Sequence, residues 1–78
     1  MEFVREVIRT MRFDNEKLNT LLKENNVTGN ALAASINRSK SVISEYRSGK
    51  MEPSKEAWYL IAKVFNKNFD YFIREDVS

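Results

Sequence analysis

Residues 28–53 read TGNALAASINRSKSVISEYRSGKMEP, and this segment gives the clearest indication of how the chain folds. Its apolar side chains recur every three or four positions, which is the spacing of a helix with one buried face. Thr28 is a predicted N-cap for a helix over 29–36, and Ser39 is a predicted N-cap for a helix over 40–47. Asn37 lies between them and tolerates the left-handed backbone of a tight turn. The stretch therefore predicts two short helices joined by a turn.

The apolar positions of these two helices are expected to fix the angle between them. They are Leu32, Ala33, Ile36, Ile43 and Tyr46. A small residue such as Ala33 lets two helices cross closely, so a larger side chain there should push them apart. This arrangement is a helix-turn-helix unit, whose second helix can enter the major groove of DNA.

The flanking sequence predicts further helices. Asp14 or Asn15 can cap a helix that ends at Asn25-Asn26, and Ser54 can cap another over 55–65. A short fifth helix is expected near the carboxyl end, after the break at 66–68. Their inward-facing residues are, in order, Leu18, Leu21, Leu22, Trp58, Leu60, Ile61, Val64, Phe65, Phe69, Tyr71, Phe72 and Ile73. The predicted fold is all-α, a compact five-helix domain over 14–78.

Residues 1–13 are interpreted as an N-terminal extension. An apolar stripe on it predicts a short helix over 1–12, formed by Phe3, Val4, Val7, Ile8 and Met11. This helix either folds back over the domain or packs against a second chain. The segment from Phe69 to Ile73 offers another dimer surface.

Composition excludes several classes of function. The chain of 78 residues has no Cys and no His, so we expect no disulfide, metal site or cofactor. The same absence removes the commonest general base and the most reactive nucleophile, so we do not expect an enzyme. Glu52 and Glu56 are better explained as favourable charges near a helix start. Charged residues interrupt the apolar region that a signal peptide needs, and no apolar run is long enough to cross a bilayer. We therefore predict a cytosolic protein without a membrane partner.

Positive charge is concentrated on one segment. The net charge is only +2, yet residues 38–55 hold five basic and two acidic side chains, a local net charge of +3. Such an asymmetry can steer a protein toward a polyanion.

Residues 28–53 resemble the Cro/repressor-type (lambda-repressor-like) helix-turn-helix family of phage and bacterial regulators. The similarity extends over roughly residues 14–75. The matching positions are Leu32-Ala33, Ser39, Ile43-Ser44, Tyr46, Gly49-Lys50, Pro53-Ser54, Leu60-Ile61-Ala62-Lys63 and Asp70-Tyr71-Phe72-Ile73.

The resemblance implies which residues contact DNA. Base contacts are expected from the helix over 40–47, through Lys40, Ser41, Ser44 and Glu45. Phosphate contacts are expected from Asn30, Arg38, Ser39, Arg47, Ser48 and Lys50.

Three positions depart from the family pattern. Gly29 stands where the family often has a Gln that contacts DNA, so that contact is expected to be lost. Asn37 replaces the usual turn Gly. Arg47 replaces a residue that is commonly Glu, which adds positive charge near the phosphates.

The leading hypothesis is a small sequence-specific transcriptional regulator, a Cro-like repressor that binds a double-stranded DNA operator as a homodimer. The resemblance places it in a bacterial or phage-infected cell, at the nucleoid, with no small-molecule substrate. The alternative is an antirepressor or antitoxin-like protein of the same fold that binds another regulator. The mild net charge, Gly29 and the apolar N-terminal stripe motivate this alternative.

Overall fold

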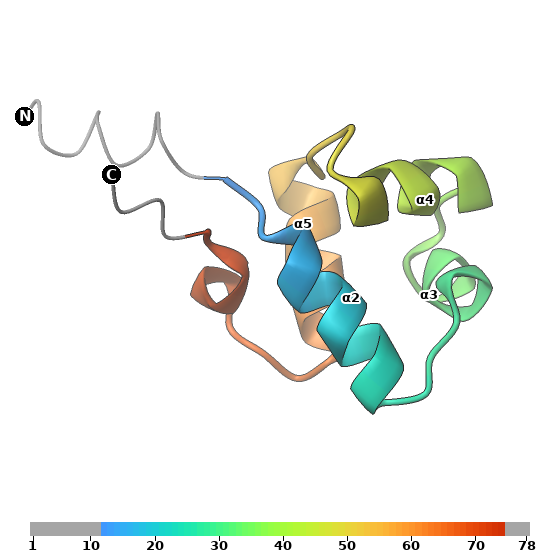
Figure 1. Ribbon diagram of the computed structural model, residues 1–78, viewed down its shortest axis with the longest axis horizontal. Coiled ribbons are helices and arrows are strands. Elements are labelled where there is room, and N and C mark those ends of the chain that lie inside the picture. Colours follow the sequence, from blue (N-terminus) through green and yellow to red (C-terminus); the bar gives the residue numbers. More distant parts are fainter. Residues whose placement is uncertain (1–11, 75–78) are drawn as a thin grey trace, which may run out of the picture.

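Residues 12–74 are described by a computed structural model, and they form four α-helices and one 3₁₀ turn (Figure 1). The elements are α2 (Asn15–Glu24), α3 (Gly29–Ile36), α4 (Lys40–Ser48), α5 (Lys55–Val64) and the 3₁₀ helix η1 (Phe69–Phe72). The predicted helix over 1–12 falls almost wholly outside the described residues. None of the helices in residues 12–74 combines the length and apolar composition needed to span a membrane.

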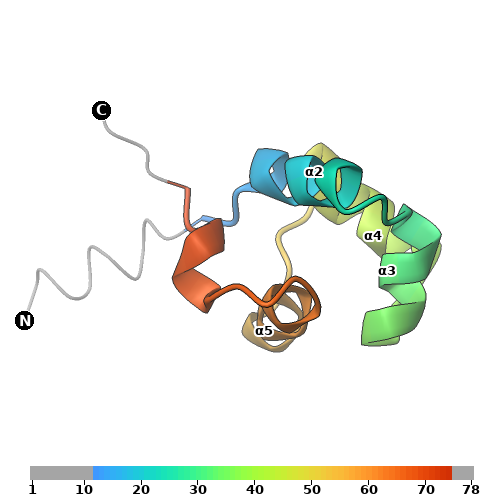
Figure 2. The ribbon, with the colours of Figure 1, turned by 90° about the horizontal axis from the view of Figure 1, so that it is seen from below.

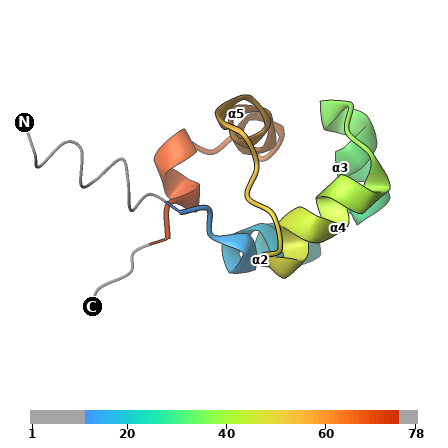
Figure 3. The ribbon, with the colours of Figure 1, turned by 90° about the horizontal axis from the view of Figure 1, so that it is seen from above.

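The helix-turn-helix pair stands apart from the ends of the described chain. In Figures 1, 2 and 3, α2 and α5 occupy the middle, α3 and α4 lie on one side, and η1 lies on the other. Helix α4 packs against both α2 and α3, and α3 also packs against α5. The rest of the fold therefore supports α4 from behind and leaves its outer face open.

Each α-helix within residues 12–74 begins directly after a residue that the sequence predicts as its N-cap. Asp14 accepts hydrogen bonds from the backbone N–H groups of the first turn of α2. Thr28, Ser39 and Ser54 each accept one from the third residue of the helix that follows. These side chains satisfy donors that a helix start would otherwise leave unpaired. The predicted starts are confirmed.

Left-handed backbone conformations separate the elements. Asn26, Asn37 and Asn66 have φ angles of 57°, 57° and 56°, and Gly49 has a φ angle of 84°. Asn tolerates this region better than most side chains, and Gly adopts it without steric cost. The turns therefore fall where the sequence places Asn and Gly.

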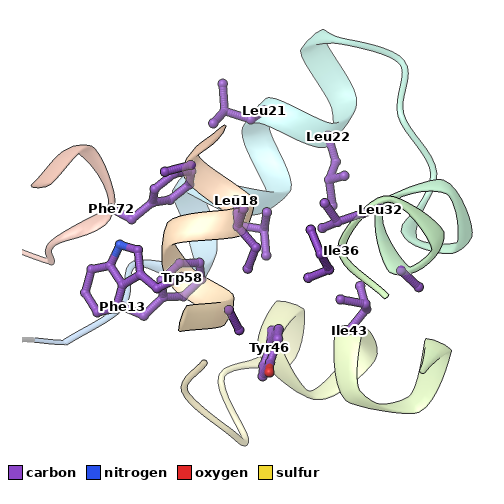
Figure 4. Packing of buried hydrophobic residues seen from close by; sticks show 14 residues of the cluster. Phe13, Leu18, Leu21, Leu22, Leu32, Ile36, Ile43, Tyr46, Trp58 and Phe72 are labelled. Carbon is purple, nitrogen blue, oxygen red and sulfur yellow. The ribbon is translucent and has the colours of Figure 1, made fainter. Parts of the chain in front are cut away.

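One hydrophobic core joins all five elements (Figure 4). Its buried side chains are Phe13, Leu18, Leu21, Leu22, Leu32, Ala33, Ile36, Ile43, Tyr46, Ala57, Trp58, Ile61, Ala62 and Phe72. The predicted inward faces of α2, α3 and α4 are confirmed. Phe13 belongs to this core, although the sequence analysis assigned it to the N-terminal extension.

Aromatic rings fill the end of the core nearest η1. The Phe13 ring meets the Trp58 ring edge-on at 5.2 Å between centroids and stacks on the Phe72 ring at 5.3 Å. Trp58 stacks on Phe69 at 4.2 Å and donates a hydrogen bond of 2.9 Å from its indole Nε1 to the Phe69 carbonyl. This arrangement satisfies the one polar atom of a buried Trp side chain. The described chain contains no buried side-chain polar atom without a partner.

The two ends of the described chain pair with each other. Phe13 and Ile73 form an isolated antiparallel bridge, and the Arg74 N–H donates to the Arg12 carbonyl at 2.8 Å. The Arg74 guanidinium lies 3.3 Å from the Asp14 carboxylate and 3.2 Å from that of Glu16. This pairing was not predicted, because it joins residues about sixty positions apart.

Two details of the predicted carboxyl-terminal helices need correction. The expected fifth helix is a single 3₁₀ turn, so the described residues contain no fifth α-helix, and Ile73 lies beyond it in extended backbone. Val64 was expected to be partly buried but is 41% exposed, because it lies at the edge of the stripe that α5 buries. Leu60 and Phe65 are half-buried, as expected.

Candidate nucleic-acid interface

Helix α4 has one buried face and one exposed face. Ile43 and Tyr46 are buried against the rest of the domain. Lys40, Ser41 and Ser44 are exposed on the other side of the helix. A helix held along one face presents the opposite side chains in a fixed direction, which suits insertion into a DNA groove.

The turn between α3 and α4 fixes their relative placement. The N–H groups of Asn37 and Arg38 donate to the carbonyls of Ala34 and Ala33, at 3.3 and 2.9 Å. The Arg38 guanidinium donates to the carbonyls of Ile36 and Asn37 and pairs with a Glu56 carboxylate at 3.4 Å. Arg38 thus ties the turn to the start of α5.

Helix α2 holds the carboxyl end of α4. The side-chain amides of Asn15 and Asn19 each donate a hydrogen bond of 2.9 Å to the Arg47 carbonyl. The same Asn19 side chain accepts a bond of 2.8 Å from Nε of Arg47. A carbonyl in the last turn of a helix lacks an intrahelical donor, so these amides supply one.

An open groove of about 650 Å³ lies beside α4. It is lined by Asn19, Thr28, Gly29, Asn30, Lys40, Ile43, Ser44, Arg47 and Ser48. These residues come from α2, the start of α3 and the length of α4.

The groove is suited to an anion. Lys40 and Arg47 contribute two positive charges to its lining, and no described lining residue is acidic. The N–H groups of Gly29 and Asn30, in the first turn of α3, have no partner within the helix. Their dipoles add positive potential at the same place. The arrangement therefore provides charged and neutral donors for an oxygen-rich anionic group.

A helix-turn-helix family model matches residues 18–72, which is most of the chain. The chain belongs to the Cro/repressor-type helix-turn-helix family. This membership confirms the resemblance drawn from residues 28–53. It identifies α3 and α4 as the two helices of the helix-turn-helix unit.

A solved structure shares the helix-turn-helix fold. The crystal structure of a transcriptional regulator from Listeria innocua aligns with a TM-score of 0.74 and 24% sequence identity. The alignment covers 88% of this chain and 65% of that one, so the chain spans just under two thirds of that protein's length. At this identity the likeness shows the fold alone. No curated protein compared with the chain matches it.

Five of the ten residues predicted to contact DNA line the groove of this protein. They are Asn30, Lys40, Ser44, Arg47 and Ser48. Ser41 and Glu45 lie on α4 outside the groove lining, where Ser41 is exposed and Glu45 is half-buried. Lys50 is exposed just after the helix.

Two predicted contacts already have partners within the domain. The Ser39 hydroxyl accepts the Val42 N–H as the N-cap of α4. Arg38 pairs with Glu56 and does not line the groove. Both residues stay predictions as phosphate contacts, and both also stabilise the turn.

Sequence reasoning missed Asn19 as a groove residue. It was treated only as part of a core helix, yet its side chain lines the groove and contacts Arg47. The available signal was its spacing of four residues from Asn15, which places two amides on one side of α2. Spacing along α2 does not indicate which helix those amides contact.

Proposed function

We propose that this protein is a sequence-specific DNA-binding transcriptional regulator that inserts α4 into the major groove. The observation that carries the proposal is the open groove with two basic residues and no acidic residue in its described lining, beside the exposed polar face of α4. A DNA phosphate fits that groove while neighbouring side chains of α4 reach base edges. Membership of the helix-turn-helix family supports the same assignment.

The proposed contacts divide into two classes. Lys40 can donate to guanine O6 and N7, Glu45 can accept from cytosine N4, and Ser41 and Ser44 can contact several bases. The remaining contacts position the protein on phosphates without reading sequence. They are Asn30, Arg38, Ser39, Arg47, Ser48 and Lys50.

The proposed mechanism of regulation is steric. A homodimer places two copies of α4 in successive major grooves, on half-sites about 34 Å apart. Occupying a promoter in this way excludes polymerase, so the protein acts as a Cro-like repressor. Its proposed location is the cytoplasm of a bacterial or phage-infected cell, at the nucleoid.

Selection of bound sites from random duplex DNA tests this proposal. We expect a palindromic consensus with half-sites separated by about one helical turn, or a multiple of it. Affinity for that consensus should fall steeply with salt, because neutralised phosphates release counterions. A pool that shows no enrichment, together with no gel shift at about 50 mM salt, would overturn the proposal.

The alternative is an antirepressor or antitoxin-like protein that binds another regulator. Exposed apolar side chains on α5 favour it, because Tyr59 is 56% exposed and Val64 is 41% exposed. This function predicts tight binding to a co-encoded repressor and no gel shift with duplex DNA at low salt. A salt-sensitive shift with DNA favours the first proposal instead.

A further inference from the structure

Gly29 occupies a position that does not require glycine for its backbone. It is the first residue of α3, and its φ angle is not positive. Glycine lowers helix propensity relative to alanine. The reason for glycine here is therefore the space that its missing side chain leaves.

Arg47 occupies that space. A Cβ atom added to Gly29 would lie 3.2 Å from Nη1 of Arg47, closer than ordinary van der Waals contact. The guanidinium thus rests against the start of α3, whose first two residues, Gly29 and Asn30, also line the groove.

Asn19 holds Arg47 in place. Its amide donates to the Arg47 carbonyl at 2.9 Å and accepts from Nε at 2.8 Å, so it binds the backbone and the side chain together. Among residues 12–74, Nε is the Arg47 guanidinium atom that donates a hydrogen bond. Arg47 is exposed and lines the groove, so its Nη atoms can meet a ligand there.

We propose that Arg47, positioned by Asn19 in the space left by Gly29, donates from its guanidinium Nη atoms to a DNA phosphate. This inference rests on the proposed function and deepens it. A planar guanidinium can bind two phosphate oxygens at once, which a lysine ammonium cannot reproduce. Gly29 and Asn19 are positioning residues for this contact.

The test uses a double-mutant cycle of Gly29→Ala and Arg47→Ala, with a fixed duplex of about 25 base pairs as the probe. Each single variant should lose about threefold to tenfold in affinity at low salt, and the double variant should lose no more than Arg47→Ala alone. Arg47→Ala should reduce the slope of log affinity against log salt by about 1 per bound protomer. Lys63→Ala removes the same charge outside the groove and should leave the slope unchanged.

Thermal unfolding separates a lost contact from a damaged fold. Gly29→Ala should unfold at the same temperature as wild type or higher, because alanine favours the helix, while its DNA affinity falls. Arg47→Lys keeps the charge and should restore only part of the affinity lost in Arg47→Ala.

A matched pair of asparagine variants tests the positioning role. Asn15→Ala removes one hydrogen bond to the Arg47 carbonyl and the bond that Asn15 accepts from Arg74, and it leaves the contact between Asn19 and the Arg47 guanidinium intact. Asn19→Ala removes an equivalent bond and the guanidinium contact as well. Only Asn19→Ala should weaken the contact between Arg47 and DNA. When Arg47 is already replaced by Ala, the two asparagine variants should bind DNA with equal affinity.

The outcomes distinguish this inference from the function on which it rests. If the wild-type protein does not bind the duplex at low salt, both fall. If the wild type binds but the affinity losses of Gly29→Ala and Arg47→Ala are additive, only the role of Arg47 is overturned. The same holds if Arg47→Lys binds the duplex as tightly as the wild type.

Discussion

Lys40 and Lys50 stand at opposite ends of α4 and should contribute differently to binding. Lys40 begins the helix and lines the groove, whereas Lys50 is exposed beyond its end. Because Lys40 is one of the proposed base-reading residues, Lys40→Ala should cost about 1–3 kcal/mol and relax the preference at one base pair. Lys50→Ala should weaken binding to all sequences alike. Competition binding with single-base operator variants measures the affinity of both lysine variants. If both lose the same affinity on every operator, this division of roles is wrong.

The two glycines should respond oppositely to the same substitution. Gly49 has a φ angle of 84°, a conformation that costs an L-residue about 1–2 kcal/mol. Gly49→Ala should lower the free energy of unfolding by about that amount, whereas Gly29→Ala should not lower it. Urea unfolding measures both, and equal stability of the two variants would contradict the conformational argument.

Ala33 is the small residue on the buried face of α3, where a larger side chain should push the helices apart. It is 4% exposed, while Ala34 on the same helix is exposed. Ala33→Leu should destabilise the domain by about 1–3 kcal/mol through overpacking. Ala34→Leu is the matched control and should be nearly neutral. Calorimetry measures the stability of both variants. An Ala33→Leu variant as stable as the wild type would mean that α3 does not cross its neighbouring helices closely.

The sequence predicted the α-helices well because their boundaries depend on local chemistry. Asp14, Thr28, Ser39 and Ser54 cap helices through hydrogen bonds to residues two or three positions away, and a short window contains both partners. The 3₁₀ geometry of η1 was not predicted. There the Phe69 carbonyl accepts the indole N–H of Trp58, a tertiary contact that local propensity does not describe.

The candidate site was predictable in part for the same reason. Lys40 and Ser44 could be assigned to the exposed face of α4 from helical spacing alone. The contact between Asn19 and Arg47 joins residues 28 positions apart. It depends on how α2 packs on α4, which spacing within one helix does not reveal.

At the scale of the whole molecule, the aromatic cluster joins both ends of the described chain to α5. Phe72 is fully buried and stacks on Phe13. Phe72→Ala should lower the free energy of unfolding by about 3–5 kcal/mol, because it removes a large buried side chain and leaves a cavity. Tyr59→Ala, at an exposed position, should have little effect. Chemical denaturation measures both, and a small loss for Phe72→Ala would show that the cluster does not support the domain.

The proposed function requires that the groove and the exposed face of α4 both contact DNA. Amide chemical-shift mapping during titration with a duplex of about 25 base pairs tests it most directly. We expect the signals of Gly29, Asn30 and residues 40–44 to move, while those of Tyr59 and Lys63 stay in place. Shifts confined to α5 and η1, with α4 unaffected, would contradict it.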